Sequence, residues 1–193
     1  MRQKSRALTL LELLIAAFLI GVIVLAIGNI EIFSRYHVTA AERRARLQNQ
    51  ISFALDHMNK NFTNAIGTIM DRAVIREANG IRVRIDSNGN GQIDASDIWT
   101  AYRHEALSGN DSVIRFYPDI INSPGASEVI SHHIALDSTG LEFLGNFDAS
   151  NQLNDSSLEV KVTARWLPNQ PSSQDNPELS MRSRIHMPSV SIH

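Results

Sequence analysis

A single apolar run near the start of the chain limits what this sequence can fold into. The run extends from Ala7 to Ile30, and Glu12 is its one charged residue. From Leu13 to Ile30 there are eighteen residues without an ionisable side chain. As an α-helix they would be about 27 Å long, close to the thickness of the hydrocarbon core of a bilayer. The sequence therefore predicts a helix that is long enough to span a membrane.

Two general interpretations of this run account for it only in part. A secretory signal peptide would use Arg2, Lys4 and Arg6 as its basic start, but the apolar part is too long and ends without a small-x-small cleavage site. A simple membrane anchor, with its short basic end inside, fits the hydropathy. It leaves Glu12 unexplained, because a charged group in hydrocarbon costs on the order of several kcal/mol.

A third interpretation uses the local order of residues. A short basic leader, the small Ala7, the segment L-T-L-L-E and an apolar helix follow one another. Over Ser5 to Ile30 this order resembles the type IV prepilin signature. The resemblance implies that prepilin peptidase cuts between Ala7 and Leu8, and that Leu8 becomes an N-methylated first residue. The family usually has Gly before the cut and Phe after it; Ala7 and Leu8 keep a small and an apolar residue there.

Glu12 becomes the fifth residue of the cleaved chain under this resemblance. A buried charge needs an opposite charge nearby, because an unpaired one is strongly destabilising. In the pilin family this acid is thought to meet the α-amino group of a neighbouring subunit, here that of Leu8, and so to fix the axial register of a filament. The other interpretation of Glu12 is an acid that lies solvated among the lipid headgroups.

Composition narrows the function of the rest of the chain. Of the 193 residues, about 160 follow the membrane helix, enough for one domain with a sizeable core. The net charge is −2, and the basic run Glu42 to Arg46 is more typical of a solvated helix face than of a nucleic-acid site. The chain contains no cysteine, which excludes disulfides and cysteine-based metal sites.

The sequence shows no motif of an enzyme. It has no nucleophile elbow and no phosphate-binding glycine loop. His57, His104 and His193 lack the spacing of metal ligands, and the adjacent His132 and His133 should point to opposite faces of a strand. We therefore expect a protein that is not an enzyme.

Hydrophobic periodicity predicts the fold class. An apolar residue recurs every three or four positions after the membrane segment, as on one buried face of a helix: Leu47, Ile51, Leu55, Met58, Phe62 and Ile66. One helix is thus predicted from about Thr9 to about Ile66, with Gly67 as its stop. Alternating segments then predict strands: 81–85, 98–104, 112–117 and 158–166, and more weakly 129–134, 140–144 and 181–187. Turns are predicted at 107–111 and in the proline-rich 167–180.

These elements predict an α+β fold, with an antiparallel sheet packed on a long N-terminal helix. The pilin resemblance implies the same layout. The expected organisation is a leader at 1–7, a transmembrane or filament-core helix at 8–30 and a head at 31–193.

A second motif lies between two predicted strands. The segment Asp86 to Asp97, D-S-N-G-N-G-Q-I-D-A-S-D, matches the twelve-residue calcium loop D-x-[DN]-x-[DN]-G. The predicted ligands occupy the first, third, fifth, seventh, ninth and twelfth positions, which are Asp86, Asn88, Asn90, Gln92, Asp94 and Asp97. Gln92 would bind through its backbone carbonyl and the other five through their side chains.

The calcium motif departs from that of a sensor EF-hand. Asp97 stands where such loops carry a bidentate Glu, only three ligands are charged, and the flanks are strands. We therefore expect a weak site, with a Kd on the order of 10⁻⁴–10⁻³ M. The alternative is an Asn-Gly turn that binds no metal.

Two function classes follow. The first is a minor pilin or minor pseudopilin, and the segment Leu47 to Phe62 resembles the pilus-assembly W and secretion J types. Such a subunit would be single-pass in a bacterial inner membrane with its head outside the cytoplasm. Its partners would be other pilins or pseudopilins, prepilin peptidase, the inner-membrane assembly platform and lipid, but not nucleic acid. The second class is a membrane-anchored, calcium-dependent binding module that does not polymerise.

Overall fold

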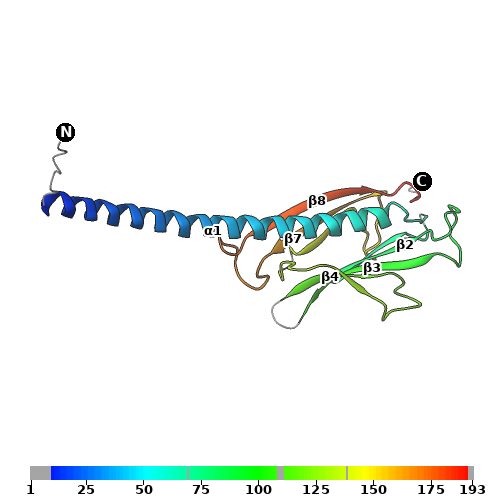
Figure 1. Cartoon of the computed structure of the whole chain (residues 1–193). Helices are drawn as coiled ribbons and strands as arrows, with labels where there is room; N and C mark the ends of the chain where they lie inside the picture. The colour runs from blue at the N-terminus through cyan, green and yellow to red at the C-terminus, as the bar shows by residue number, and fades with distance from the viewer. Residues whose placement is uncertain (1–9, 69, 108–110, 138, 191–193) are drawn as a thin grey trace. The chain divides into compact units, whose positions relative to one another are not determined.

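The structure is a computed structural model, and it describes residues 10–68, 70–107, 111–137 and 139–190. One helix, α1 (Leu10–Phe62), precedes all the strands, and this order confirms the α+β class (Figure 1). The chain divides into two compact units, Met1–Glu42 and Arg43–His193. The unit that starts at Arg43 is called the head below. The predicted cleavage residues Ala7 and Leu8 lie outside the described residues.

The first unit contains the N-terminal part of α1, and its large apolar side chains are exposed. The exposed fraction is 84% at Leu10, 61% at Ile20 and 63% at Val38. Leucine, alanine and isoleucine dominate the sequence up to Ile30, and the structure forms the continuous helix that this composition predicts. The helix is long and apolar enough to cross a membrane.

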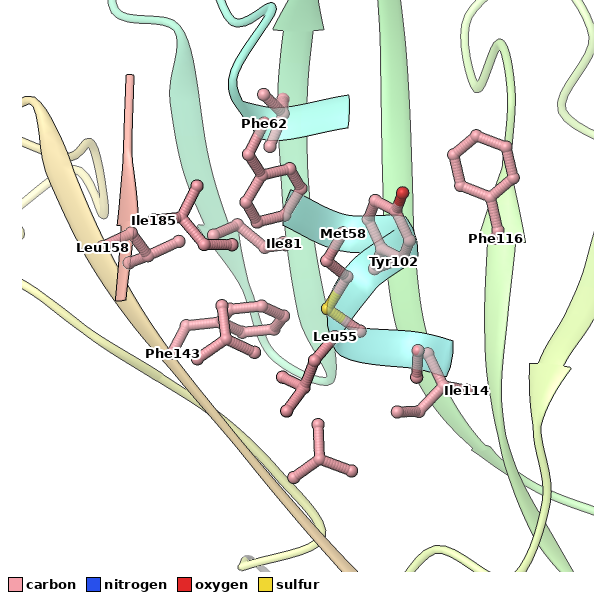
Figure 2. Packing of buried hydrophobic residues seen from close by; sticks show 14 of the residues in the cluster. Leu55, Met58, Phe62, Ile81, Tyr102, Ile114, Phe116, Phe143, Leu158 and Ile185 are labelled. Atoms are coloured by element: carbon pink, nitrogen blue, oxygen red, sulfur yellow. The ribbon is translucent and has the colours of Figure 1, made fainter. Parts of the chain in front are cut away.

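The second part of α1 lies in the head and is amphipathic. Its buried residues recur every three or four positions: Leu47, Ile51, Ala54, Leu55, Met58 and Phe62. This confirms the predicted stripe. Figure 2 shows Leu55, Met58 and Phe62 in one core with Ile81 and Tyr102.

The helix ends at Phe62, so the predicted end near Ile66 is wrong. The side chains of Thr63 and Asn64 donate hydrogen bonds to the carbonyl of Lys60, at 2.9 and 3.3 Å. Such bonds compete with the helical pattern of the backbone. The next residues turn to the sheet, where the amide of Ile66 donates to the carbonyl of Arg84 at 3.1 Å.

In the part of the chain that the structure describes, eight antiparallel strands form two sheets, so the single sheet we predicted is wrong. The first sheet has the order β1-β2-β3-β4-β5 and the second the order β6-β7-β8. The strands are β1 (Val74–Glu77), β2 (Gly80–Ile85), β3 (Ile98–Ala106), β4 (Ser112–Tyr117), β5 (Glu128–Ser131), β6 (Leu141–Leu144), β7 (Ser157–Arg165) and β8 (Glu178–His186).

The chain passes from one sheet to the other directly after β5. His133 has a left-handed backbone, with φ of 61°, which ends the extended strand predicted at 129–134. The amide of the following Ile134 still reaches the carbonyl of Ser112 in the first sheet, at 3.0 Å. The amide of Ala135 then donates to the carbonyl of Thr163 on β7, at 2.9 Å. Apolar side chains of both sheets meet those of α1 in the core (Figure 2).

Two further boundaries differ from the prediction. Strand β8 starts at Glu178, two residues before the predicted end of the 167–180 loop. Its early residues pair with the far end of β7, Glu178 with Arg165 and Leu179 with Ala164. Strand β1, which the sequence did not single out, pairs with β2 through a tight turn at Ala78 and Asn79.

Candidate functional site

The predicted calcium loop joins β2 to β3 and keeps an exposed, irregular backbone. Gly89 and Gly91 have φ values of 69° and 71°, the left-handed region that glycine enters without a steric cost. Both glycine amides donate to the carboxylate of Asp86, at 2.7 and 2.8 Å. The first predicted ligand is thus held in place by the backbone that curls around it.

The two asparagines of the motif face the fourth predicted side-chain ligand. The amide nitrogens of Asn88 and Asn90 lie 3.1 and 2.7 Å from Oδ2 of Asp94. Their side-chain oxygens accept backbone amides two residues ahead, from Asn90 at 3.0 Å and from Gln92 at 2.6 Å. The backbone carbonyl is the predicted ligand group of Gln92, whose amide takes part in this turn.

Asp94 is the most strongly hydrogen-bonded group of the loop. Its Oδ1 accepts the amide of Ser96 at 2.8 Å and the hydroxyl of Ser96 at 2.6 Å. These bonds, together with those from Asn90 and Asn88, hold the pKa of Asp94 well below its usual range. Asp94 therefore stays negatively charged across the physiological pH range. Sequence reasoning missed Ser96, although Asp-x-Ser is a spacing at which a side chain reaches a nearby amide.

Asp97 carries an acceptor that the fold leaves unused. Its Oδ2 accepts the amide of Asp94 at 3.0 Å. Its Oδ1 is buried and has no hydrogen-bond partner among the described residues. A buried acceptor without a partner costs on the order of 1–3 kcal/mol, so this oxygen would gain from an added donor or cation.

The loop brings the predicted ligands into one hydrogen-bonded structure, but not all of their oxygens face the same point. Asn88 and Asn90 turn their NH₂ groups toward Asp94. Each amide would have to rotate to offer its oxygen to a cation, a change that leaves the shape of the side chain nearly unaltered. Among the described residues, no group of three or more His, Asp or Glu side chains could hold a metal ion.

The base of the loop is tied to the end of α1. The amide of Asp86 donates to the carbonyl of Asn64 at 3.1 Å, and Ala65 forms a bridge with Ile85. The conformation of the loop is therefore coupled, through these backbone hydrogen bonds, to the turn between α1 and the sheet.

Glu12 is the predicted site residue at the other end of the described chain. It lies in the first turn of α1 and is exposed. A negative charge in this turn interacts favourably with the helix dipole. The sequence prediction had considered only partners outside the subunit, and this local contribution adds to them.

His132 and His133 each have a contact of their own in the head. His132 Nδ1 is 2.9 Å from Oδ2 of Asp111, and the ring of His133 stacks on Trp166 at 4.9 Å. The His132 and His133 rings are 6.4 Å apart, in keeping with different partners.

A Ser–His pair also occurs in the head. His104 Nε2 lies 2.5 Å from Oγ of Ser112. Ser112 is fully buried, so a substrate could not reach its hydroxyl. The pair therefore fits cross-strand packing between β3 and β4.

Comparisons with protein-family models, with curated proteins and with solved structures give no significant match to this chain.

Proposed function

We propose that this protein is a structural subunit of a type IV filament system, a minor pilin or minor pseudopilin. One observation carries the proposal: a single helix, Leu10–Phe62, is exposed and apolar in its first part and forms the core of a head in its second. Such a helix needs a membrane before assembly and other apolar helices after it. The prepilin-like order around Ala7, Leu8 and Glu12 is the second support.

In this proposal the head is a structural and recognition module and the protein is not an enzyme. The subunit is inserted once in a bacterial inner membrane, cleaved and methylated by prepilin peptidase, and passed by the assembly platform into a pilus or pseudopilus. It contacts other subunits and lipid, and no nucleic acid.

The mature N-terminus tests this proposal directly. Mass spectrometry of the membrane-extracted protein should find a methylated chain that starts at Leu8. An intact start at Met1, or a cut beyond Ile30, would remove the filament proposal. The first of these outcomes would favour the membrane-anchored binding module.

Glu12 provides the test of assembly. Glu12→Gln should leave insertion intact, because a neutral side chain costs less to bury. It should strongly lower the fraction incorporated into filaments, because the charge that meets a neighbouring amine is gone. Glu31→Gln is the matched control: Glu31 lies on the same helix, exposed, 2.5 Å from Arg35. Equal incorporation of both variants would leave Glu12 without an assembly role.

We further propose that the loop Asp86–Asp97 binds calcium. Carboxylate and amide oxygens are the ligands that calcium prefers, and Oδ1 of Asp97, a residue of this loop, is a buried acceptor without a hydrogen-bond partner among the described residues. Asp86, Asp94 and Asp97 would supply the charge, Asn88 and Asn90 the neutral side-chain oxygens, and Gln92 its carbonyl. The bound ion would offset repulsion among the acids and stabilise the loop.

The calcium loop is also the observation that favours the second candidate function. A membrane-anchored module that recognises a partner in a calcium-dependent way would use the same anchor and the same loop. The two candidates differ in processing and polymerisation, so the start of the mature chain separates them.

A further inference from the structure

The exposed apolar surface of α1 continues beyond the expected membrane span. Large apolar side chains stay exposed after Ile30, with 66% at Phe33 and 57% at Tyr36. The head begins only at Arg43. The helical segment Glu31–Val38 therefore lies between the apolar span and the head, and we call it the collar.

The length of the helix places the collar relative to a bilayer. Glu12 is the last charged residue before the span, so the hydrocarbon segment starts near Leu13. About 20 residues cross the hydrocarbon core, which brings the helix to about Ile32. The headgroup layer adds about 5–8 Å on each side, or about three to five residues of helix. The residues after Ile32 therefore fall within the headgroup layer on the side of the head.

The collar has two chemically different sides. At about 100° per residue, Ile32, Phe33, Tyr36 and His37 fall on one side of the helix, called the aromatic side here. The rings of Phe33 and His37 make an edge contact, with centroids 4.2 Å apart. On the other side, Glu31 and Arg35 form an ion pair at 2.5 Å next to Ser34, and Val38 is the large apolar residue there.

We propose that the collar is a lipid-binding surface whose aromatic side lies in the phospholipid headgroup layer on the head side of the membrane. Aromatic side chains with polar edges are enriched at this depth, because one part of the ring is apolar and another contacts water. A helix with a long apolar segment also tilts, by about 20° on average, and one side then lies deeper than the other. The proposal rests on the membrane anchoring proposed above, and it does not depend on filament assembly.

Because the chain has no cysteine, the exposure of each collar position to water can be measured through an introduced thiol. Any introduced cysteine is the single thiol of the chain. We would introduce Ser34→Cys and Tyr36→Cys separately into the full chain, in phospholipid nanodiscs that hold one copy each. The reaction rate with a water-soluble maleimide is measured and divided by the rate in denaturing detergent. Ile20→Cys is the reference for a thiol in the middle of the span, and Ala41→Cys is the reference for a thiol in water.

The two collar positions distinguish the effect of the helix side from the effect of depth in the membrane on the reaction rate. Tyr36 is two residues farther along the helix than Ser34 and about 200° around it. If depth alone decides, Tyr36→Cys reacts faster than Ser34→Cys. If the aromatic side lies in the headgroups, Tyr36→Cys reacts several-fold more slowly than Ser34→Cys. We expect the second result, with Ala41→Cys fastest and Ile20→Cys slowest.

Three outcomes would overturn the proposal. Tyr36→Cys could react as fast as Ser34→Cys or faster, which would remove the sidedness. It could be shielded only in nanodiscs that hold two copies, which would assign the aromatic side to a second helix. Ile20→Cys could react as fast as Ala41→Cys, which would remove the membrane anchor together with the collar. Failed filament assembly with the expected labelling order would reject the filament proposal alone.

A second variant tests the role of the neighbouring ring. Phe33→Ser should raise the rate of Tyr36→Cys, because an adjacent anchor is lost, and should leave that of Ser34→Cys nearly unchanged. An unchanged rate at Tyr36→Cys would mean that the aromatic side does not hold this segment in the headgroups.

Discussion

The two parts of α1 use the same kinds of apolar residue for different surroundings. Ile20, in the first part, is 61% exposed, whereas Ile51, in the head, is fully buried. From Leu13 to Ile30 the first part is apolar on all sides, and the second part is apolar along one stripe. Both are parts of one continuous helix. The distribution of apolar residues around the helix determines which surroundings it needs.

The sharpest test of this comparison is the same substitution in both parts. Ile51→Ala should lower the free energy of unfolding of the head by about 2–5 kcal/mol, because it leaves a cavity in a packed core. Ile20→Ala should leave that free energy within about 0.5 kcal/mol, because Ile20 is exposed and belongs to the unit outside the head. Urea unfolding of the full chain in nanodiscs, followed by fluorescence of Trp99 and Trp166, reports on the head.

Phe53→Ala is a control within the head itself. Phe53 lies on α1 between buried residues but is 58% exposed. It should cost much less than Ile51→Ala. Equal losses at Ile20 and Ile51 would mean that the two parts of the helix unfold together, contrary to the division of the chain into two units.

Calcium should act on the head and leave the apolar part unchanged. At ten to a hundred times Kd, binding would stabilise the head by about 1.4–2.7 kcal/mol. We expect the melting temperature of the head to be several degrees higher in millimolar calcium than in chelator, measured by tryptophan fluorescence. Magnesium should substitute poorly, because it keeps its water and requires octahedral geometry.

The double variant Asp86→Ala, Asp97→Ala should lose the response to calcium. Asp148→Ala is the matched control, because Asp148 holds a different turn through bonds to Ser150 and Gln152. A melting temperature that ignores calcium, with no heat of binding at millimolar metal, would show that the loop is an Asn-Gly turn.

The smallest expected effect is a dependence on pH that is confined to the head. Burial lowers the pKa of His57, partly offset by Glu128, and burial also lowers the pKa of His104. The unfolded chain then binds protons more readily than the folded one. Stability contributed by the neutral histidines is present above pH 6.5 and is lost as the pH falls below this value.

His57→Gln should therefore flatten the loss of head stability between about pH 7 and 5, as measured by urea unfolding at several pH values. His37→Gln changes a histidine of the exposed part of α1 and should leave the profile unaltered. A steeper loss in His57→Gln than in the parent would contradict the sign of the effect.

The existence of the long helix, its buried stripe and most strands could be predicted from sequence because they depend on local periodicity. The buried stripe and β4 (Ser112–Tyr117) are where the pattern placed them. The division into two sheets could not be predicted, since the chain leaves the first sheet through the left-handed backbone of His133, which the alternating pattern of 129–134 does not mark. The helix end was missed because side-chain bonds from Thr63 and Asn64 replace the helical pattern.

The candidate site shows the same limit. The motif predicted the positions of the loop residues, because the spacing of ligands along the chain is visible in the sequence. The direction of the Asn88 and Asn90 amides and the unused oxygen of Asp97 depend on how the loop closes between β2 and β3. The hydrogen bond from the hydroxyl of Ser96 to Asp94 likewise depends on the folded backbone of the loop.

The joint between α1 and β2 determines how the head would carry mechanical load. Directly after the helix, Asn64 and Ile66 are hydrogen-bonded to Asp86 and Arg84, at the end of the second strand of a five-stranded sheet. Tension applied through the helix would thus reach a strand that is paired on both sides through these backbone hydrogen bonds. A pull on the helix would also reach the proposed calcium loop, because the amide of Asp86, its first residue, is hydrogen-bonded to the carbonyl of Asn64.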